Sequence, residues 1–107
     1  MIKNNSSNKV ISKSEIICDS ILSRTLGLMF KPKSNLLMIF PEEQKISLHM
    51  FFVFYPIDVL VVDKIKKIIE IKRNFEPFTL WKSKKEGKFI IELAFSSEYK
   101  VGDKLEF

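Results

Sequence analysis

The stretch Ile46-Ser-Leu-His-Met-Phe-Phe-Val-Phe-Tyr55 carries the clearest structural signal in the sequence. Its even-numbered positions are all apolar: Ile46, Leu48, Met50, Phe52 and Phe54. Alternation with a period of two is typical of a β-strand, because successive side chains point to opposite faces of a sheet. We therefore expect a strand whose even-numbered side chains face the core.

Further strands are predicted on both sides of this stretch. Residues 36–40 form a continuous apolar run of strand length, and residues 58–62 and 68–73 flank a polar connection, which indicates a β-hairpin. Residues 75–81 contain Pro77, which favours an edge strand or an ordered loop. Residues 89–94 form another apolar strand, and residues 105–107 form a closing strand.

One short helix is predicted before these strands, over residues 19–27. Asp19 is placed to accept hydrogen bonds from the free N–H groups at the start, and Gly27 allows the left-handed conformation that ends a helix. The whole pattern predicts a mainly β fold, a small antiparallel β-sandwich or partly closed barrel with one short N-terminal helix. Residues 1–9 are expected to be a flexible tail, and residues 10–107 a single β-rich domain.

Charge is concentrated in one part of the chain. The net charge is +5, yet residues 64–88 alone hold nine Lys or Arg against three Glu, which is +6. The single cysteine, Cys18, cannot form an internal disulfide, and no secretory signal is recognisable, so we expect a cytoplasmic protein. The longest uncharged apolar run, residues 46–57, is too short to span a membrane, so no membrane partner is expected.

Several short motifs occur in an order that resembles a known family. They are Ser23-Arg24-Thr-Leu-Gly27-Leu28-Met29, Leu37-Met-Ile-Phe40, His49-Met50, Pro56-Ile57-Asp58, Glu92-Leu93 and Gly102-Asp103. Together they resemble domain of unknown function family 192, also called uncharacterised protein family 0127, over about residues 10–107. The resemblance implies a compact β-rich domain of bacteria and archaea with no established activity. Many members carry Trp-Met-Lys-Asn-Thr where this chain reads His49-Met50-Phe51-Phe52-Val53.

Polar residues of these motifs are the candidates for a binding site. The six candidate ligand-binding residues are Arg24, His49, Met50, Asp58, Glu92 and Asp103. Asp58 and Glu92 lie in apolar strands, and a buried carboxylate needs a cation or several donors, which Arg24 is able to supply. This favours a small polar pocket that binds a small polar ligand or a protein partner. In the alternative interpretation, Asp58 caps a turn after Pro56 and Glu92 faces water.

The sequence also allows two other functions besides this binding site. Cations interleave with aromatic residues at Lys72, Arg73, Phe75, Phe78, Trp81 and Lys82, a pattern suited to stacking and neutralising single-stranded nucleic acid. Alternatively, these aromatic residues complete the core while the lysines solubilise two turns. A hydrolase that uses paired carboxylates is the third hypothesis.

No catalytic residue, metal site or cofactor is predicted. One Cys and one His are too few for a structural zinc site, and the three glycines lie too far apart to cradle a phosphate. A Cys18–His49 nucleophilic pair is conceivable, but we expect a buried Cys18 and a partly exposed His49. The sequence therefore leans away from an enzyme.

Overall fold

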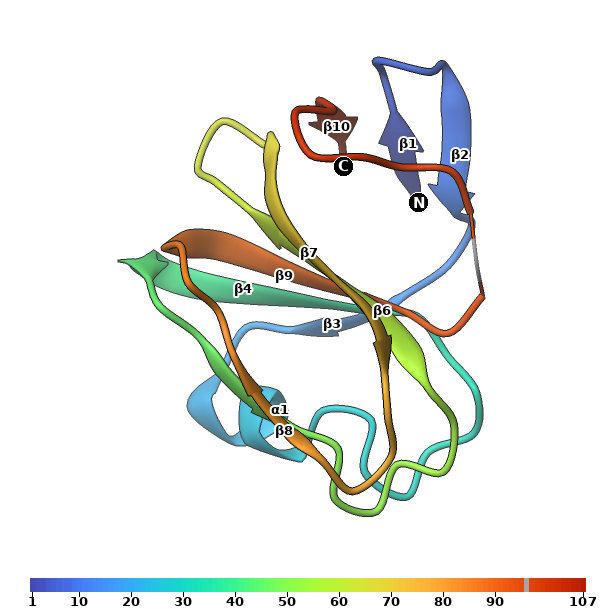
Figure 1. Ribbon diagram of the computed structural model, residues 1–107, viewed down its shortest axis with the longest axis vertical. Coiled ribbons are helices and arrows are strands. Elements are labelled where there is room, and N and C mark those ends of the chain that lie inside the picture. The colour runs from blue at the N-terminus through green and yellow to red at the C-terminus, as the bar shows by residue number, and fades with distance from the viewer. Residues whose placement is uncertain (96) are drawn as a thin grey trace.

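A mixed sheet with the strand order β3-β4-β9-β6-β7 runs through the middle of the computed structural model (Figure 1). Its strands are β3 (Ile16–Cys18), β4 (Leu36–Gln44), β9 (Gly87–Leu93), β6 (Ile57–Val62) and β7 (Ile68–Phe75). The structure describes residues 1–95 and 97–107, and for residues 21 and 22 only the backbone. β3 pairs with β4 in parallel, and the other neighbours are antiparallel. The mainly β prediction is confirmed, although the sheet is mixed and the described strands form no closed barrel.

Both faces of this central sheet are buried. Val59 and Val61 of β6 pack into one hydrophobic cluster, whereas Leu60 and Val62 pack into another on the opposite face. A strand that is covered on both sides reads as a continuous apolar run, because neither set of side chains meets water. The alternating pattern suggests a single shared interior. The structure instead has two hydrophobic interiors, one on each face of the sheet.

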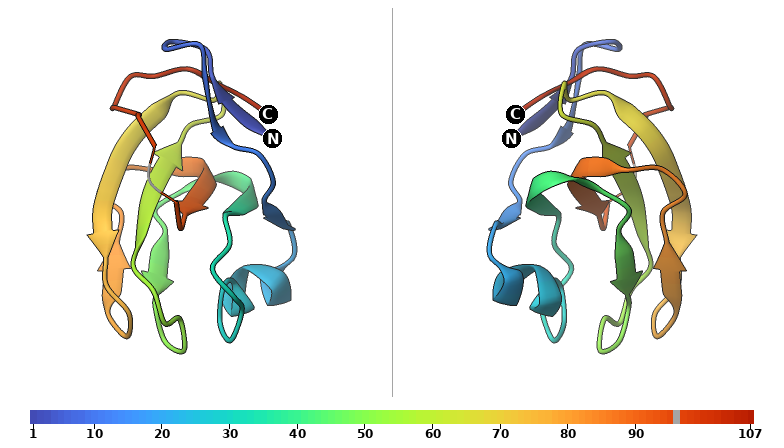
Figure 2. Two further views of the ribbon diagram at one scale, coloured as in Figure 1. Left: turned by 90° about the vertical axis from the view of Figure 1, so that its right-hand side faces the viewer. Right: turned by 90° about the vertical axis from the view of Figure 1, so that its left-hand side faces the viewer.

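One face of the sheet is covered by helix α1 (Ile21–Leu26) and by the ribbon of β5 (Ser47–His49) and β8 (Leu80–Lys82) (Figure 2). The helix begins at Ser20, whose side chain accepts from the Ser23 N–H while the Ser23 hydroxyl accepts from the Ser20 N–H. The predicted cap at Asp19 is thus one residue early. Gly27 ends the helix as expected and has a positive φ of 49°, but its ψ of −125° differs from that of the left-handed conformation.

The opposite face is covered by a sheet with the order β10-β1-β2, built from the two ends of the chain. Its strands are β1 (Ile2–Asn4), β2 (Lys9–Ser12) and β10 (Leu105–Glu106). Residues 1–9 are therefore not a flexible tail throughout, because Ile2 is completely buried and Asn4 pairs with Leu105. The strand is held by its pairing with β10 and β2 and by the burial of Ile2.

The stretch that opens the sequence analysis is only partly a strand. Ile46, Leu48 and Met50 are buried as expected, but Phe52 and Phe54 are exposed and Val53 is buried instead. β5 ends at His49, and the following turn has a left-handed backbone at Phe52, which reverses the alternation. The predicted hairpin is confirmed, since β6 and β7 pair antiparallel across residues 63–67. Within the described residues, no helix has the length and apolar character to cross a membrane.

Candidate functional site

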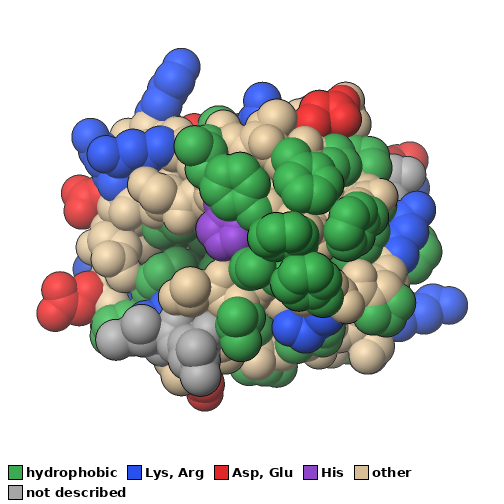
Figure 3. Space-filling view, turned by 90° about the horizontal axis from the view of Figure 1, so that it is seen from below, with side chains coloured by type: hydrophobic (Ala, Val, Ile, Leu, Met, Phe, Trp, Pro, Cys, Tyr) green, Lys and Arg blue, Asp and Glu red, His purple; other side chains and the backbone are tan. Residues whose placement is uncertain are grey.

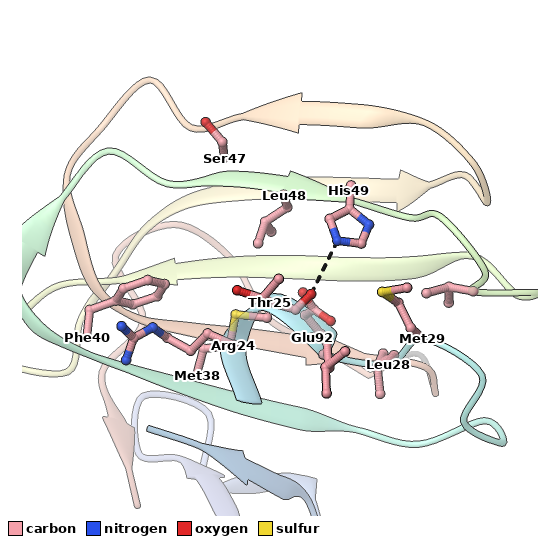
Figure 4. Close-up of a pocket in the computed structure, with 13 residues that line it drawn as sticks. Arg24, Thr25, Leu28, Met29, Met38, Phe40, Ser47, Leu48, His49 and Glu92 are labelled. Carbon is pink, nitrogen blue, oxygen red and sulfur yellow. Dashed lines mark hydrogen bonds between the residues drawn. The ribbon is translucent and has the colours of Figure 1, made fainter. Parts of the chain in front are cut away.

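A pocket of about 320 Å³ opens between helix α1, strand β5 and the central sheet (Figure 4). The end of α1 and the loop after it form one wall, β5 forms a second, and β4 and β9 form the floor. Most of its lining is apolar, with polar side chains at a few positions. The lining residues used below are Arg24, Leu28, Met38, Leu48, His49 and Glu92.

Glu92 is the buried acidic group of this pocket. It lies on β9 on the same face as Ile90, so the sheet directs its side chain into the apolar interior below α1. Its exposed fraction is 5%, and no hydrogen bond or ion pair to its carboxyl group exists among the described residues. Desolvation by burial raises the pKa of Glu92 from 4.5 to about 7. At neutral pH both the protonated and the ionised forms are therefore populated.

The Glu92 oxygens reach the open space of the pocket. Among the described residues, every side-chain nitrogen or oxygen that is fully sealed from solvent has a hydrogen-bond partner. Since the Glu92 carboxyl group has no such partner, its oxygens are not sealed but border the cavity, as Figure 4 also shows. A group of this kind is available to a bound molecule.

Arg24 lines the same pocket without pairing with Glu92. Its Nη1 donates to the carbonyl oxygens of Asp19 and Ile39, both at 3.0 Å. Its guanidinium group lies over the Phe40 ring, 4.7 Å from the ring centre, a favourable cation–π contact. The bidentate pairing of Arg24 with Asp58 or Glu92 is therefore wrong, and Arg24 instead joins α1 to the edge of β4.

His49 stands at the wall formed by β5. Its Nδ1 accepts from the Phe51 N–H at 3.2 Å, and its Nε2 lies 3.3 Å from the Thr25 carbonyl oxygen (Figure 4). An Nδ1 that accepts a hydrogen bond places the proton of the neutral ring on Nε2, which then donates to Thr25. His49 thus links β5 to α1 across the pocket, with both ring nitrogens in use.

Asp58 lies outside this pocket, on the opposite face of the sheet. Its carboxylate accepts from Arg73 Nη1 at 3.3 Å, from the Asn74 N–H at 2.9 Å and from the Tyr99 hydroxyl. Burial, followed by the hydrogen bond to Asp58, raises the pKa of Tyr99. The predicted grouping of Arg24, Asp58 and Glu92 is therefore wrong for Asp58, which accepts three hydrogen bonds elsewhere.

The candidates Asp103 and Met50 have contacts that stabilise the fold. Asp103 is buried and accepts from Asn4 Nδ2 at 2.7 Å and from the Lys100 N–H at 2.9 Å, so it holds β1 beside the C-terminal turn. Met50 is 1% exposed and belongs to the core below β5. Neither side chain lines the pocket that contains Glu92.

The basic, aromatic segment is not one continuous surface. Phe75 is 1% exposed and packs edge-on against Trp81, which itself lies against the core. Of the three aromatic candidates only Phe78 is exposed, and Arg73 lies over the Tyr99 ring. The structure does not support base stacking by Phe75, whose ring is buried in the core, whereas Trp81 is partly exposed. Lys72 is half-buried on β7, and Lys82 is exposed at the end of β8.

Cys18 is buried in the core below α1, as expected. Burial raises the pKa of its thiol, an effect that Lys31 partly opposes. A thiol of this kind is a poor nucleophile, because the thiolate is the reactive form. No group of three or more potential metal ligands occurs among the described residues.

The apolar part of the pocket was not anticipated as a binding surface. Leu28, Met38 and Leu48 come from three separate elements and read in the sequence as ordinary core residues. One sequence motif did point to this surface, because Leu28 directly follows Gly27 in the motif that also contains the candidate residue Arg24.

Comparison with known sequences gives one consistent result. The family model DUF192, described as Uncharacterized ACR, matches residues 2–107. A UPF0127 protein of Pyrococcus horikoshii is 34% identical over 114 residues, covering 100% of this chain and 98% of that protein. A UPF0127 protein of Thermococcus sibiricus is 33% identical over 96 residues and 86% of this chain, which spans 62% of that relative's length.

Solved structures of similar fold come from bacteria. A Sinorhizobium meliloti protein, provisionally described as a transcription regulator, superposes with a TM-score of 0.72 at 22% identity, covering 84% of this chain and 78% of that one. A protein of unknown function from Novosphingobium aromaticivorans gives a TM-score of 0.76 at 17% identity, with 85% and 72% covered. At these identities the likeness concerns the fold alone.

Proposed function

The chain belongs to the DUF192 family of uncharacterized proteins, and from that premise we propose that it binds a small molecule in the pocket above Glu92. The observation that carries this proposal is the Glu92 carboxyl group, which is buried, borders the cavity and lacks a partner among the described residues. A buried polar group without a partner costs free energy that a bound donor recovers. The site therefore favours a ligand that donates a hydrogen bond.

The lining indicates the rest of the ligand. Leu28, Met38 and Leu48 surround the carboxyl group with apolar surface, and ligand pockets generally combine such surface with a few placed polar groups. A cavity of about 320 Å³ is at the small end of the usual range for ligand pockets. The proposed ligand is a small molecule with an apolar body and one amine or hydroxyl group directed at Glu92.

Binding without catalysis is the form of this proposal that the site supports best. Glu92 is the one carboxylate that lines the pocket among the described residues, whereas a hydrolase with paired carboxylates needs two across one cleft. The nucleic-acid alternative has less support, because Phe75 is buried in the core and Trp81 is partly buried against it. We place the protein in the cytoplasm as part of the same proposal, on the support of its single, unpaired Cys18.

The test uses three probes that share one apolar body, namely cyclohexylamine, cyclohexanol and cyclohexanecarboxylate. Side-chain methyl NMR signals of Met38, Leu28 and Leu48 are followed as each probe is added at pH 8. We expect the amine and the alcohol to shift these signals and the carboxylate to have little effect, since a second anion beside Glu92 is repelled. Native mass spectrometry of the protein purified from its own cells then identifies the natural ligand.

Two variants make the result decisive. Glu92→Leu removes the acceptor, so the shifts caused by the amine should disappear. Glu86→Gln removes an exposed carboxylate elsewhere and should leave the shifts unchanged. The proposal is rejected if no probe affects the pocket signals, or if the amine shifts them equally in wild type and in Glu92→Leu.

A further inference from the structure

Four phenylalanines form a connected exposed surface, which we name the aromatic face: Phe30, Phe52, Phe54 and Phe78. Phe30 stacks on Phe52 with ring centres 4.7 Å apart. Phe78 meets Phe52 and Phe54 edge-on, at 5.9 and 5.6 Å. Their exposed fractions lie between 44% and 69%. Figure 3 shows hydrophobic side chains gathered beside His49 on this side of the molecule.

The backbone at three of these four rings adopts an energetically unfavourable conformation. Phe30, Phe52 and Phe78 have φ values of 58°, 60° and 60°, in the left-handed region that bulky side chains rarely occupy. Glycine or asparagine is the usual residue at such positions. Strained backbone of this kind clusters at functional sites, where another requirement outweighs local stability. Here three loops that are far apart in the sequence each adopt this strained backbone and present an aromatic ring on the same face.

The size of the surface matches a protein interface. A buried phenylalanine contributes on the order of 200 Å², so the exposed parts of the four rings amount to about 450 Å². Leu80, 71% exposed and paired with His49 in the β5–β8 ribbon, and Phe51, stacked on His49, extend this area. A standard dimer buries about 800 Å² on each partner, including a polar rim. The aromatic face supplies the apolar centre of such an interface.

The charges of the chain favour a second copy over nucleic acid. The four members of the face carry no charge, whereas nucleic-acid binding requires cations among the aromatic residues. The basic β6–β7 turn, residues 63–67, lies at the end of the molecule opposite the aromatic loops (Figure 1). Two copies that meet through the aromatic face therefore keep these positive turns far apart.

We propose that the protein forms a two-fold symmetric homodimer through the aromatic face. In a two-fold interface the same patch meets itself, so ring faces of one copy meet ring edges of the other, the arrangement aromatic pairs prefer. The proposal is independent of the ligand pocket, because none of the four phenylalanines lines it.

The test is sedimentation equilibrium of the full chain from about 1 μM to about 1 mM, a range that spans weak and moderate dimers. We expect wild type to dimerise within this range. The double variant F30N/F78N should weaken dimerisation at least about tenfold while its melting temperature stays equal or rises, because asparagine suits both left-handed positions. Phe54→Ser, at a position with ordinary backbone, should weaken dimerisation as well.

A matched control lies at the far end of the molecule. Ile65 is 55% exposed in the β6–β7 turn, and Ile65→Ser should leave dimerisation unchanged. A wild-type protein that stays monomeric over the whole range overturns the proposal. So does a dimer that survives both aromatic variants, or one that Ile65→Ser weakens to the same extent.

Discussion

Asp58 and Glu92 lie on neighbouring strands of one sheet and have opposite surroundings. β6 pairs with β9 so that Val59 is opposite Glu92, which places Asp58 and Glu92 on different faces. Asp58 accepts three hydrogen bonds, whereas the Glu92 carboxyl group has none among the described residues. The contrast teaches that a carboxylate within an apolar strand is not by that position alone a candidate for a binding site. What distinguishes Glu92 is the missing partner.

The same contrast extends to the two ends of the molecule. At the end that holds β1, β2 and β10, polar side chains such as Asn4 and Asp103 satisfy each other. At the other end lie a carboxyl group with no partner in the part of the chain that the structure describes and exposed rings on strained backbone. Natural sequences break local rules mainly where function demands it. The first end is therefore expected to govern stability, and the second end binding.

The strongest test of this division is Ile2→Ala. Ile2 is completely buried at the stable end, and removing such a side chain leaves a cavity, so we expect a loss of about 4 kcal/mol in the free energy of unfolding. Urea denaturation measures it. Ile65→Ala, at an exposed position, should cost less than about 0.5 kcal/mol. Equal effects of the two changes would show that β1 contributes nothing to the fold.

The next largest effect concerns the pH dependence that Glu92 creates. Its pKa is about 7 in the folded protein and about 4.5 when unfolded, so between these values the folded state binds more protons. The contribution of Glu92 to stability is therefore fully present below about pH 4.5 and is lost as the pH rises from there to about 7, by about 3 kcal/mol in total. Glu92→Gln, which does not titrate, should lack this decline.

Other groups titrate over the same range, so the measured quantity is the difference between wild type and Glu92→Gln. Chemical denaturation at pH 4.5 and at pH 8 provides it. The free energy of unfolding of the variant, relative to that of wild type, should therefore increase as the pH increases. A difference that stays constant would mean that Glu92 is solvated or paired in the folded protein, and the contrast with Asp58 would fail.

The smallest expected effect belongs to the satisfied carboxylate. Tyr99→Phe removes one of the three donors to Asp58, and we expect a loss of about 1.5 kcal/mol, typical of a hydrogen bond to a charged acceptor. Tyr55→Phe is the matched control, because its hydroxyl donates only to the Pro32 carbonyl oxygen at the surface. Thermal denaturation of both variants should rank Tyr99→Phe as the more harmful. The reverse ranking would show that Asp58 does not depend on Tyr99.

Much of the fold could be predicted from local patterns, and the errors of the prediction have identifiable causes. The β6–β7 hairpin is set by two apolar runs with a polar turn between them, all of which are local. Phe52 and Phe54 were misplaced because the turn after His49 has a left-handed backbone at an aromatic residue, which sequence preferences disfavour. β1 was missed because its stability comes from a partner strand about a hundred residues away.

The candidate site was predicted only in part, for a reason specific to sheets. Alternation correctly grouped Asp58 with Leu60 and Val62 on one face. It could not place that face relative to Glu92, because the register between β6 and β9 depends on long-range pairing, and a shift of one residue exchanges the two faces. Arg24, His49 and Glu92 do share a pocket, but the apolar residues around them resembled ordinary core.

The pairing of β1 with β10 has a consequence during synthesis. β1 leaves the ribosome long before β10 exists, so the apolar surface that both strands cover stays open while most of the chain is made. A nascent chain stalled before residue 105 should therefore expose that surface to chaperones and proteases. The residues that line the pocket end at Glu92, so all of them precede β10 in the chain.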